Sequence, residues 1–584
     1  MRNLRSRRHF ARIVVAALMW ATVIASLPLR QPMHAQRRAI DTYAITNARI
    51  VTVSGPVIER GTVVVRDGLI AAVGANASAP ADARIIDGAG LTVYPGLIDA
   101  STTLGIPRPT PAPGASPNPN PFAAFLGPAA PPSATSPNST QPPGLQPEIL
   151  AADIVRPGGE QIEAARNAGV TSALTVPRSN VFLGQSAFIN LAGETPQQMI
   201  VRAPVALHVG FTPLAGSYPG SLMGVFSSVR QMLLDAQRYR EANAVYDRNP
   251  RGMRRPEQDK SLAALLPALA RQMPVVMQAE REREIVRALD LAQEFNLQVV
   301  IAGGLESWKV AERLKTMNVP VLLSLNFPKR TTAENTEADP EPLRTLRERA
   351  EAPKAAARLA AAGVPFAFQS GSMTNMADYL ANAGKAVESG LARDEALRAL
   401  TLRAADILGV DDRLGSIEVG KIANLTVTRG DLFDRSRRIT HVFIDGRPVD
   451  LKPETTAAAT GAANVSGTWS LRVNTGGIGE TPEVNITLLL QQQGDRITGS
   501  IQGPLGTSQI ANASQGAAGE LRFTVPVQIG GQTTEANFVG AVTGNEMRGT
   551  VEIVGRGSGT FTGTRPNAPA TTTPAPAPSP PSKV

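Results

Sequence analysis

Six short apolar segments separated by helical sequence constrain the fold of this 584-residue chain most strongly. A helical pattern such as residues 281–296 lies between two of them, with Ile285, Leu289 and Ala292 on one face. Apolar strands that alternate with helices predict a parallel sheet covered on both faces. We therefore predict an α/β fold with a (β/α)₈ TIM-like barrel, whose functional groups lie at the carboxyl ends of the strands. The six segments begin at Val170, Val205, Pro274, Leu297, Val319 and Val364.

Two β-rich segments flank this middle region. "YAITNARIVTVSG" begins at Tyr43, and "GSIEVGKIANLTVTRGD" begins at Gly415. Short β-branched runs closed by Gly or Asp-Gly predict strands and tight turns. We predict one composite β-sandwich from residues 36–95 and 411–452, around a barrel at residues 96–410.

A Pro-rich insertion at residues 106–147 interrupts the predicted barrel after its first strand. It holds 14 prolines between Pro107 and Pro147, too many for helix or sheet. We expect an extended or disordered segment, and a lid or a partner-binding arm is the alternative.

The remaining C-terminal sequence predicts a separate all-β domain. A linker at residues 453–464 leads to residues 465–564, where apolar and polar residues alternate between glycine turns. This pattern indicates an antiparallel meander, closed as a small barrel or stacked as a sandwich. Residues 565–584 are rich in Pro, Ala and Thr and predict a disordered tail.

The first 35 residues have the pattern of an export signal. Five arginines precede the apolar run from Ile13 to Leu27, and a cleavage site is predicted after Ala35. "SRRHFAR" from Ser6 resembles a twin-arginine signal. We predict a bacterial periplasmic or secreted protein with no membrane span after cleavage; an uncleaved anchor is the alternative. Cleavage would remove six arginines and no acid and lower the net charge from +9 to +3, which does not indicate nucleic-acid binding.

The stretch "VYPGLIDASTTLG" from Val93 to Gly105 contains a motif that indicates function. With the β-rich start before it and "AVESGLARDEALRALTLRAADILGVDDRLGSIEVGKIANLTV" near the end, it resembles the amidohydrolase superfamily, especially the imidazolonepropionase-like branch. The resemblance covers about residues 43–451. It implies one or two divalent metals, usually zinc, which activate water for attack on carbon–nitrogen bonds.

The metal ligands that the resemblance implies do not stand at the matching positions. Ser101 and Thr103 replace the His-x-His after the first strand, Gln278 replaces a histidine, and Gly371 replaces the catalytic aspartate. On the sixth strand, Gly303 and Gly304 stand where a histidine is expected. We therefore expect no cofactor, and zinc or another divalent metal only if the protein is an active enzyme.

The histidine count supports this interpretation. The chain has four histidines: His9 and His34 lie in the predicted signal, and His441 lies in the returning β segment. His208 alone remains for the barrel, and several imidazoles cannot come from one residue. Because the chain has no cysteine, thiolate sites are excluded as well.

A few polar residues remain as candidates. Glu280 and Glu306, which follow predicted strands, are candidate acid–base residues, and His208 is a third candidate; the alternatives are solvated loop carboxylates and a core histidine. The candidates for substrate binding also include a predicted Gly184-Gln185-Ser186 turn whose amides would face a ligand, with a hairpin packed on the barrel as the alternative. The substrate-binding candidates are Ser101, Thr103, Gln185, Ser186 and Ser370.

Three functions are compatible with the sequence. The first is an exported protein without the ancestral metal chemistry, retained to bind a small molecule or a cell-envelope ligand. The second is an active hydrolase of non-peptide carbon–nitrogen bonds with a non-standard metal site. The third is a carbohydrate- or polymer-binding protein, and a homo-oligomer is possible in each case.

Overall fold

The computed structural model describes the chain from residue 42 to residue 565, with gaps. The described residues form two compact units, 42–451 and 465–565. The predicted signal, most of the Pro-rich insertion, the linker and the tail after residue 565 lie outside the described residues. The described residues are 42–107, 139, 141–142, 144–214, 218–329, 342–373, 375–451, 465–474, 483–493, 496–504, 506–515, 520–529, 532–553 and 557–565.

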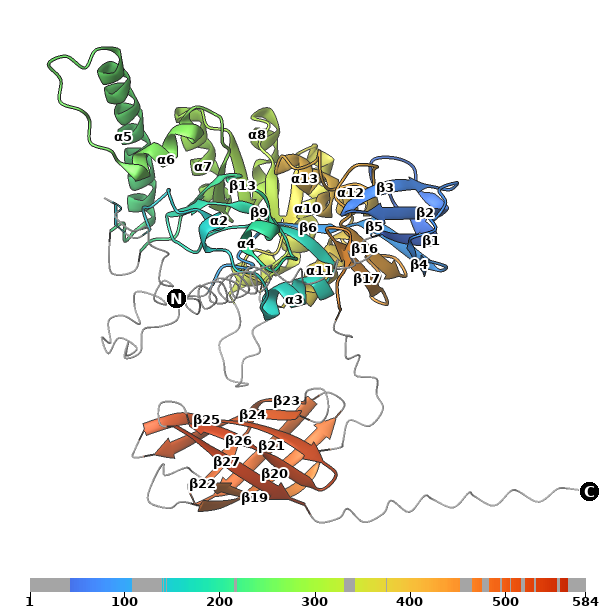
Figure 1. Ribbon diagram of the computed structural model, residues 1–584. Helices are drawn as coiled ribbons and strands as arrows, with labels where there is room; N and C mark the ends of the chain where they lie inside the picture. Colours follow the sequence, from blue (N-terminus) through green and yellow to red (C-terminus); the bar gives the residue numbers. More distant parts are fainter. Residues whose placement is uncertain are drawn as a thin grey trace, which may run out of the picture. The chain divides into compact units, whose positions relative to one another are not determined.

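One sheet of the first unit combines strands from its two ends (Figure 1). Strand β5 pairs with β16, with Leu91 opposite Arg429 and Pro95 opposite Leu425, so residues more than 300 positions apart become neighbours. The inner side chains form their own apolar core, which includes Ile50, Val93 and Phe443. The order is β18-β17-β16-β5-β1-β2-β3, with β4 on β1. The strands are β1 Thr42–Ile50, β2 Ile58–Arg66, β3 Leu69–Gly74, β4 Arg84–Asp87, β5 Leu91–Pro95, β16 Leu425–Arg429, β17 Arg438–Ile444 and β18 Arg447–Pro448.

A TIM-type barrel forms the centre of the first unit. Its strands β11 to β15 pair in parallel in chain order, and β6 pairs in parallel with β7. A parallel bridge between Thr102 and Gly371 joins the last strand to the first. The carboxyl ends of these strands therefore meet at one mouth. The parallel strands are β6 Leu97–Thr102, β7 Val170–Thr175, β11 Leu207–Gly210, β12 Val275–Ala279, β13 Val299–Gly303, β14 Val321–Ser324 and β15 Phe366–Gln369.

The remaining position in the barrel wall is filled by an inverted strand. Strand β9 (Ala187–Asn190) runs antiparallel to β7, and β8 (Phe182–Gln185) runs antiparallel to β11. Only Ser186 separates them, so one segment bridges both neighbours. The predicted all-parallel (β/α)₈ pattern is therefore corrected at this position, and so are the turn and the hairpin predicted here.

Helices cover the outside of the barrel (Figure 1). Helix α7 buries Ile285, Leu289 and Ala292, as the sequence pattern predicts. No helix of the described residues is both long and apolar enough to cross a membrane. The remaining elements are α2 Ala151–Ile154, α3 Glu160–Asn167, α4 Pro196–Met199, β10 Ile200–Arg202, α5 Leu222–Arg248, α6 Lys260–Leu269, α7 Glu282–Glu294, η2 Ser307–Val310, α8 Ala311–Thr316, α9 Leu343–Glu351, η3 Ala352–Lys354, α10 Ala355–Ala362, α11 Ala377–Glu388, α12 Arg393–Leu400 and α13 Leu402–Ile407.

The second unit is a closed antiparallel barrel. Strands β22 and β23, separated only by Ile510, pair with β21 and β24, and β19 pairs with both β20 and β27. This pairing is that of a closed barrel, one of the two predicted arrangements. The strands are β19 Gly467–Asn474, β20 Glu483–Gln493, β21 Arg496–Gly503, β22 Gly506–Gln509, β23 Ala511–Gln515, β24 Glu520–Ile529, β25 Gln532–Thr543, β26 Glu546–Ile553 and β27 Gly557–Thr564.

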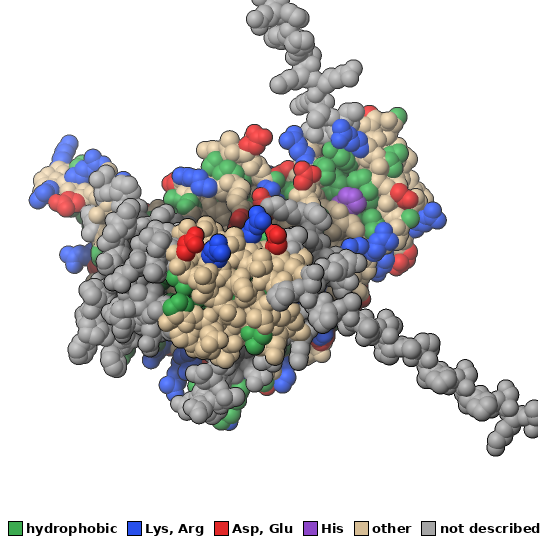
Figure 2. Space-filling model, turned by 90° about the horizontal axis from the view of Figure 1, so that it is seen from below, with side chains coloured by type: hydrophobic (Ala, Val, Ile, Leu, Met, Phe, Trp, Pro, Cys, Tyr) green, Lys and Arg blue, Asp and Glu red, His purple; other side chains and the backbone are tan. Residues whose placement is uncertain are grey.

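Apolar side chains fill the interior of this barrel, among them Trp469, Phe523 and Phe561. The guanidinium of Arg565 lies 4.7 Å from the centre of the Trp469 ring and donates to the Ser466 carbonyl at 2.7 Å. The last described residue is thereby attached to the first strand. In the view from below, the surface of this barrel carries few charged side chains (Figure 2).

Candidate functional site

The mouth of the TIM-type barrel is the candidate site, because ligands bind there in proteins of this fold. Ser101 and Gly371 meet there at the junction of the first and last strands. The Ser101 carbonyl accepts the N–H of Gly371 at 3.0 Å, and Ser101 is almost fully buried. Thr103 follows it and is half-buried. The structure thus brings together two of the positions that the resemblance aligns with metal ligands.

A buried aspartate that the sequence analysis did not select closes the barrel at this junction. The Oδ1 atom of Asp99 accepts the backbone N–H of Ser370 at 2.8 Å, and Oδ2 accepts its hydroxyl. Burial raises the pKa of Asp99 to about 6, although the hydrogen bonds from Ser370, Ser101 and Thr102 oppose the shift. The hydroxyl of Ser370 is therefore committed to Asp99 and is buried. Asp99 is the aspartate of "PGLIDA", and its place in this motif was the sequence feature that could have identified it.

Gly371 leaves space at the position where the resemblance implies an aspartate. A Cβ built on Gly371 would meet only Ser324 Oγ, at 4.0 Å. Gln278 lies at the exposed end of β12, across the mouth. The mouth therefore presents the exposed Gln278 and the half-buried Thr103, with open space beside Gly371.

Glu280 has a strongly perturbed carboxyl group at this end of the barrel. Its carboxylate lies over the α-carbon of Gly303, where a Cβ would be 2.5 Å from Oε1. The residue is exposed by its surface area, although protein atoms near the carboxylate desolvate it. Desolvation raises its pKa to about 7; the Leu305 N–H, at 3.4 Å, lowers it, and the charges of Glu284 and Glu348 raise it further. No lysine or arginine of the described residues forms an ion pair with it.

Glu306 does not form a free acid–base pair with Glu280. One carboxylate oxygen accepts the Glu282 N–H at 2.9 Å, at the start of α7, and the other accepts Lys309 Nζ at 2.7 Å. Burial raises the pKa of Glu306, but these bonds lower it more, so it lies below its usual value. A carboxylate held at a helix N-terminus and by a lysine stabilises the helix start. Glu306 therefore has a structural role at the start of α7, and Glu280 alone of the two remains a candidate acid–base residue.

His208 lies inside the barrel wall on β11. It is fully buried, and neither ring nitrogen has a hydrogen-bond partner among the described residues. Its neighbours across the strands are Val276 and Gly184. Burial lowers its pKa to about 3, so the ring is neutral at physiological pH. This environment is that of a core histidine.

Gln185 and Ser186 lie in the inverted strand. The N–H of Gln185 donates to the Ile149 carbonyl at 2.7 Å, and that of Ser186 donates to the Ala206 carbonyl at 2.9 Å. Both residues are buried. The expectation that a turn here presents free amides to a ligand is therefore wrong, because the sheet and the neighbouring loop use those amides.

The donor set at the mouth does not fit a zinc site. Zinc in hydrolases is held by three or four imidazole, carboxylate or thiolate groups. The positions matched to metal ligands hold Ser101, Thr103, Gln278 and Gly371. Within the described part of the chain, no three His, Asp or Glu side chains are grouped so as to hold a metal ion.

Comparison with known proteins agrees with the barrel. Residues 160–449 match the family model described as Amidohydrolase family. No curated protein matches this chain. The structure of an amidohydrolase from Thermotoga maritima MSB8 is similar, at 25% identity and a TM-score of 0.58, over 70% of this chain and 100% of that chain.

Two prolidase structures show a more distant likeness. A prolidase complexed with N-methylphosphonate-L-proline is 18% identical with a TM-score of 0.44, over 70% of this chain and 100% of that chain. A putative prolidase from Bifidobacterium longum is 18% identical with a TM-score of 0.42, over 72% of this chain and 97% of that chain. From the family match and the Thermotoga structure, we conclude that this chain carries an Amidohydrolase family domain on a TIM-type barrel.

Proposed function

We propose that this protein binds a small organic ligand at the barrel mouth and lacks the metal-dependent hydrolysis of its superfamily. The observation that carries the proposal is the residue set Ser101, Thr103, Gln278 and Gly371 at the positions matched to metal ligands. Neutral hydroxyl and amide groups bind a transition metal weakly, because the metal prefers imidazole and thiolate donors. The same groups hydrogen-bond well to a neutral polar ligand.

The open space beside Gly371 supports ligand binding at this mouth. A family aspartate would fill that space, and here only Ser324 Oγ approaches a Cβ position, at 4.0 Å. A cleft with a few hydroxyl and amide groups is typical of small-molecule sites. The proposed ancestry is the imidazolonepropionase-like branch, on the sequence motifs at both ends of residues 43–451.

The metal content of the protein tests this proposal directly. The mature chain, purified without a histidine tag or chelator, is analysed by elemental mass spectrometry before and after exposure to zinc. We expect far less than one metal per chain in both samples. A variant that restores S101H, T103H, Q278H and G371D is the positive control for the method. A near-stoichiometric transition metal in the wild-type protein would contradict the proposal.

An active hydrolase of carbon–nitrogen bonds is the second candidate, and Glu280 favours it. A carboxyl group with a pKa near 7, exposed at a barrel mouth, has the properties of a general acid–base. The chain also resembles the Thermotoga amidohydrolase at 25% identity. In this case Glu280 accepts a proton from the attacking water and donates one to the leaving nitrogen.

Turnover assays separate the two candidates. Hydantoins, lactams and dipeptides are tested with the wild-type protein and with E280Q. Turnover by the wild-type protein, together with a kcat at least 100-fold lower and an unchanged KM in E280Q, supports the hydrolase. Saturable binding of a compound from this panel with no turnover supports the binding protein.

We further propose that the protein is exported by the twin-arginine route to the periplasm or the medium. "SRRHFAR" and the apolar run after it support this proposal. The variant R7K/R8K is expected to remain in the cytoplasm, as measured by cell fractionation. Export of this variant at the wild-type level would contradict the twin-arginine route.

A further inference from the structure

A cavity lies at the end of the barrel opposite the mouth. It measures about 130 Å³ and includes Val364 and Pro365, which precede β15. Because the carboxyl end of β15 leads to the mouth, this cavity is at the amino end of the strand. It therefore belongs to neither the candidate site nor the proposed function.

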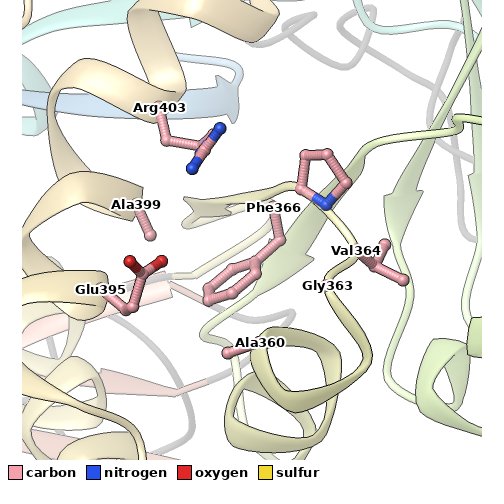
Figure 3. Close-up of a pocket in the computed structure, with 8 residues that line it drawn as sticks. Ala360, Gly363, Val364, Phe366, Glu395, Ala399 and Arg403 are labelled. Carbon is pink, nitrogen blue, oxygen red and sulfur yellow. The ribbon is translucent and has the colours of Figure 1, made fainter. Parts of the chain in front are cut away.

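The cavity combines an apolar floor with two opposite charges (Figure 3). The Phe366 ring and the methyl groups of Ala360 and Ala399 provide the apolar surface. Glu395 and Arg403 point into the space from α12 and α13, one on each side of Ala399. The two charged groups thus face the same small volume.

Two successive helices contribute the residues around the hollow. Glu395 and Ala399 are four residues apart on α12 and share one face of that helix, whereas Arg403 comes from α13, after the break at Thr401. Ala399 is the smallest of the three and lies between the two long side chains. A small residue flanked by long side chains leaves room for a ligand between the charges.

The two charged groups have no strong partner in the described residues. No ion pair joins Glu395 to Arg403 there. The guanidinium of Arg403 lies 4.0 Å from Asp406, whose side chain is 63% exposed. An exposed pair at this distance contributes little, because water screens it. Both groups are therefore available to a ligand.

We propose that this cavity binds a small zwitterion, namely a free α-amino acid. Its ammonium group would bind the Glu395 carboxylate, and its carboxylate would bind the Arg403 guanidinium, whose planar donors match a carboxylate. A small apolar side chain would pack on Phe366. A ligand with a single charge would leave one of the two protein groups without a counter-charge.

Calorimetric titration of the full mature chain tests the proposal. Glycine, L-alanine and L-leucine are the probes, and propylamine and propionate each lack one of the two charges. We expect saturable binding of at least one amino acid, and at least tenfold weaker binding of both single-charge compounds. Equal binding of propylamine, or no saturable binding of any amino acid at 50 mM, would overturn the proposal.

Three variants locate the binding in this cavity. E395Q and R403Q each remove one charge with little change in shape and are expected to weaken amino-acid binding at least tenfold. A399L fills the space and is expected to abolish binding. E388Q, which removes an exposed partner of Arg435, is the matched control and is expected to bind normally.

The conservative variants keep the test decisive if A399L fails to fold. Melting temperatures within 3 °C of wild type for E395Q and R403Q show that the fold is retained. Unchanged affinity in both variants would show that any observed binding occurs elsewhere. If the two side chains pair with each other in solution and close the cavity, the wild-type protein will not bind, and the proposal fails.

Discussion

The carboxyl group of Glu280 differs from that of Glu306 although both follow neighbouring strands of the same barrel. Glu306 is bound by Lys309 and by a backbone N–H at the start of α7, which hold its pKa below the usual value. Glu280 has a single long hydrogen bond and acidic neighbours, so desolvation dominates. Two carboxylates that look alike in the sequence therefore have different charge states near neutral pH.

Glu280 is predicted to titrate near pH 7. The protein labelled with ¹³C at the glutamate carboxyl groups is titrated by NMR. We expect one resonance with a midpoint near 7, and its absence in E280Q. E282Q, which removes a nearby exposed carboxylate, should leave that resonance in place. A wild-type spectrum in which every glutamate titrates below pH 5.5 would contradict this prediction.

His208 is predicted to make the first unit sensitive to acid. Its pKa is about 3 in the folded protein and about 6.5 when unfolded, so between these values the unfolded chain binds a proton that the folded chain does not. The stability is complete above pH 6.5 and falls as the pH decreases toward 3. The slope from this residue is at most about 1.4 kcal/mol per pH unit.

The variant H208L measures this contribution. The free energy of unfolding is determined by denaturant titration between pH 7 and pH 4.5. The wild-type protein should lose more stability than H208L over this range. H441Q is the control, because His441 is only partly buried and should contribute a smaller difference. If the free energy of unfolding depended equally on pH in wild type and in H208L, this prediction would be wrong.

Sequence patterns predicted the positions of residues at the mouth but not their hydrogen-bond partners. "PGLIDASTT" located Ser101 and Thr103 at the end of the first barrel strand, where the structure has them. The pattern did not show that Ser370 is bound to Asp99, because this contact joins residues 271 positions apart. Hydrogen bonds between distant strands depend on closure of the barrel, which local sequence does not encode.

The element that sequence analysis misread is the segment of β8 and β9. "VFLGQSAFIN" is a nearly continuous apolar run, and such a run does not reveal whether a buried strand is parallel or antiparallel. The helices between the other strands indicate parallel pairing, but a short connection precedes this one. Its direction is fixed by pairing with β7 and β11. The regular elements, such as α7, followed from periodicity alone.

Gly184 is predicted to be essential for this inverted strand. Its φ is +108°, and a Cβ there would lie 2.4 Å from the Ile149 carbonyl oxygen. G184A should therefore lower the free energy of unfolding by about 3 kcal/mol, from backbone strain and overpacking together. G158A is the matched control, with φ +76° and open space around the Cβ, and should cost about 1 kcal/mol from strain alone. Denaturant titration of both variants measures the difference, and equal losses would show that the contact with Ile149 is relieved at no cost.

At the scale of the whole molecule, the two units have separate cores. The apolar cluster around the barrel includes no residue beyond 451, and the cluster around Trp469 includes none before 465. Alternating patterns and glycine turns predicted an antiparallel meander, because a meander is built from neighbours in sequence, but they left open whether it closes as a barrel or stacks as a sandwich. Two β-rich segments of similar texture predicted a composite β-sandwich, and in the structure strands from both ends of the first unit form one sheet.

Separate cores predict that the two units unfold independently. Among residues 36–584, tryptophan is confined to Trp308 in the first unit and Trp469 in the second. In W308F, the emission of Trp469 therefore reports on the second barrel alone, while far-UV circular dichroism reports on both units. We expect the two signals to give different denaturation midpoints, which a single two-state transition cannot do. Adding G184A to W308F should shift the part of the dichroism transition that belongs to the first unit and leave the Trp469 midpoint unchanged. A shift of both midpoints by the same amount would show that the two units unfold as one. The ligand sites proposed for the first unit would then have to be tested in the full chain, because the first unit would not be stable by itself.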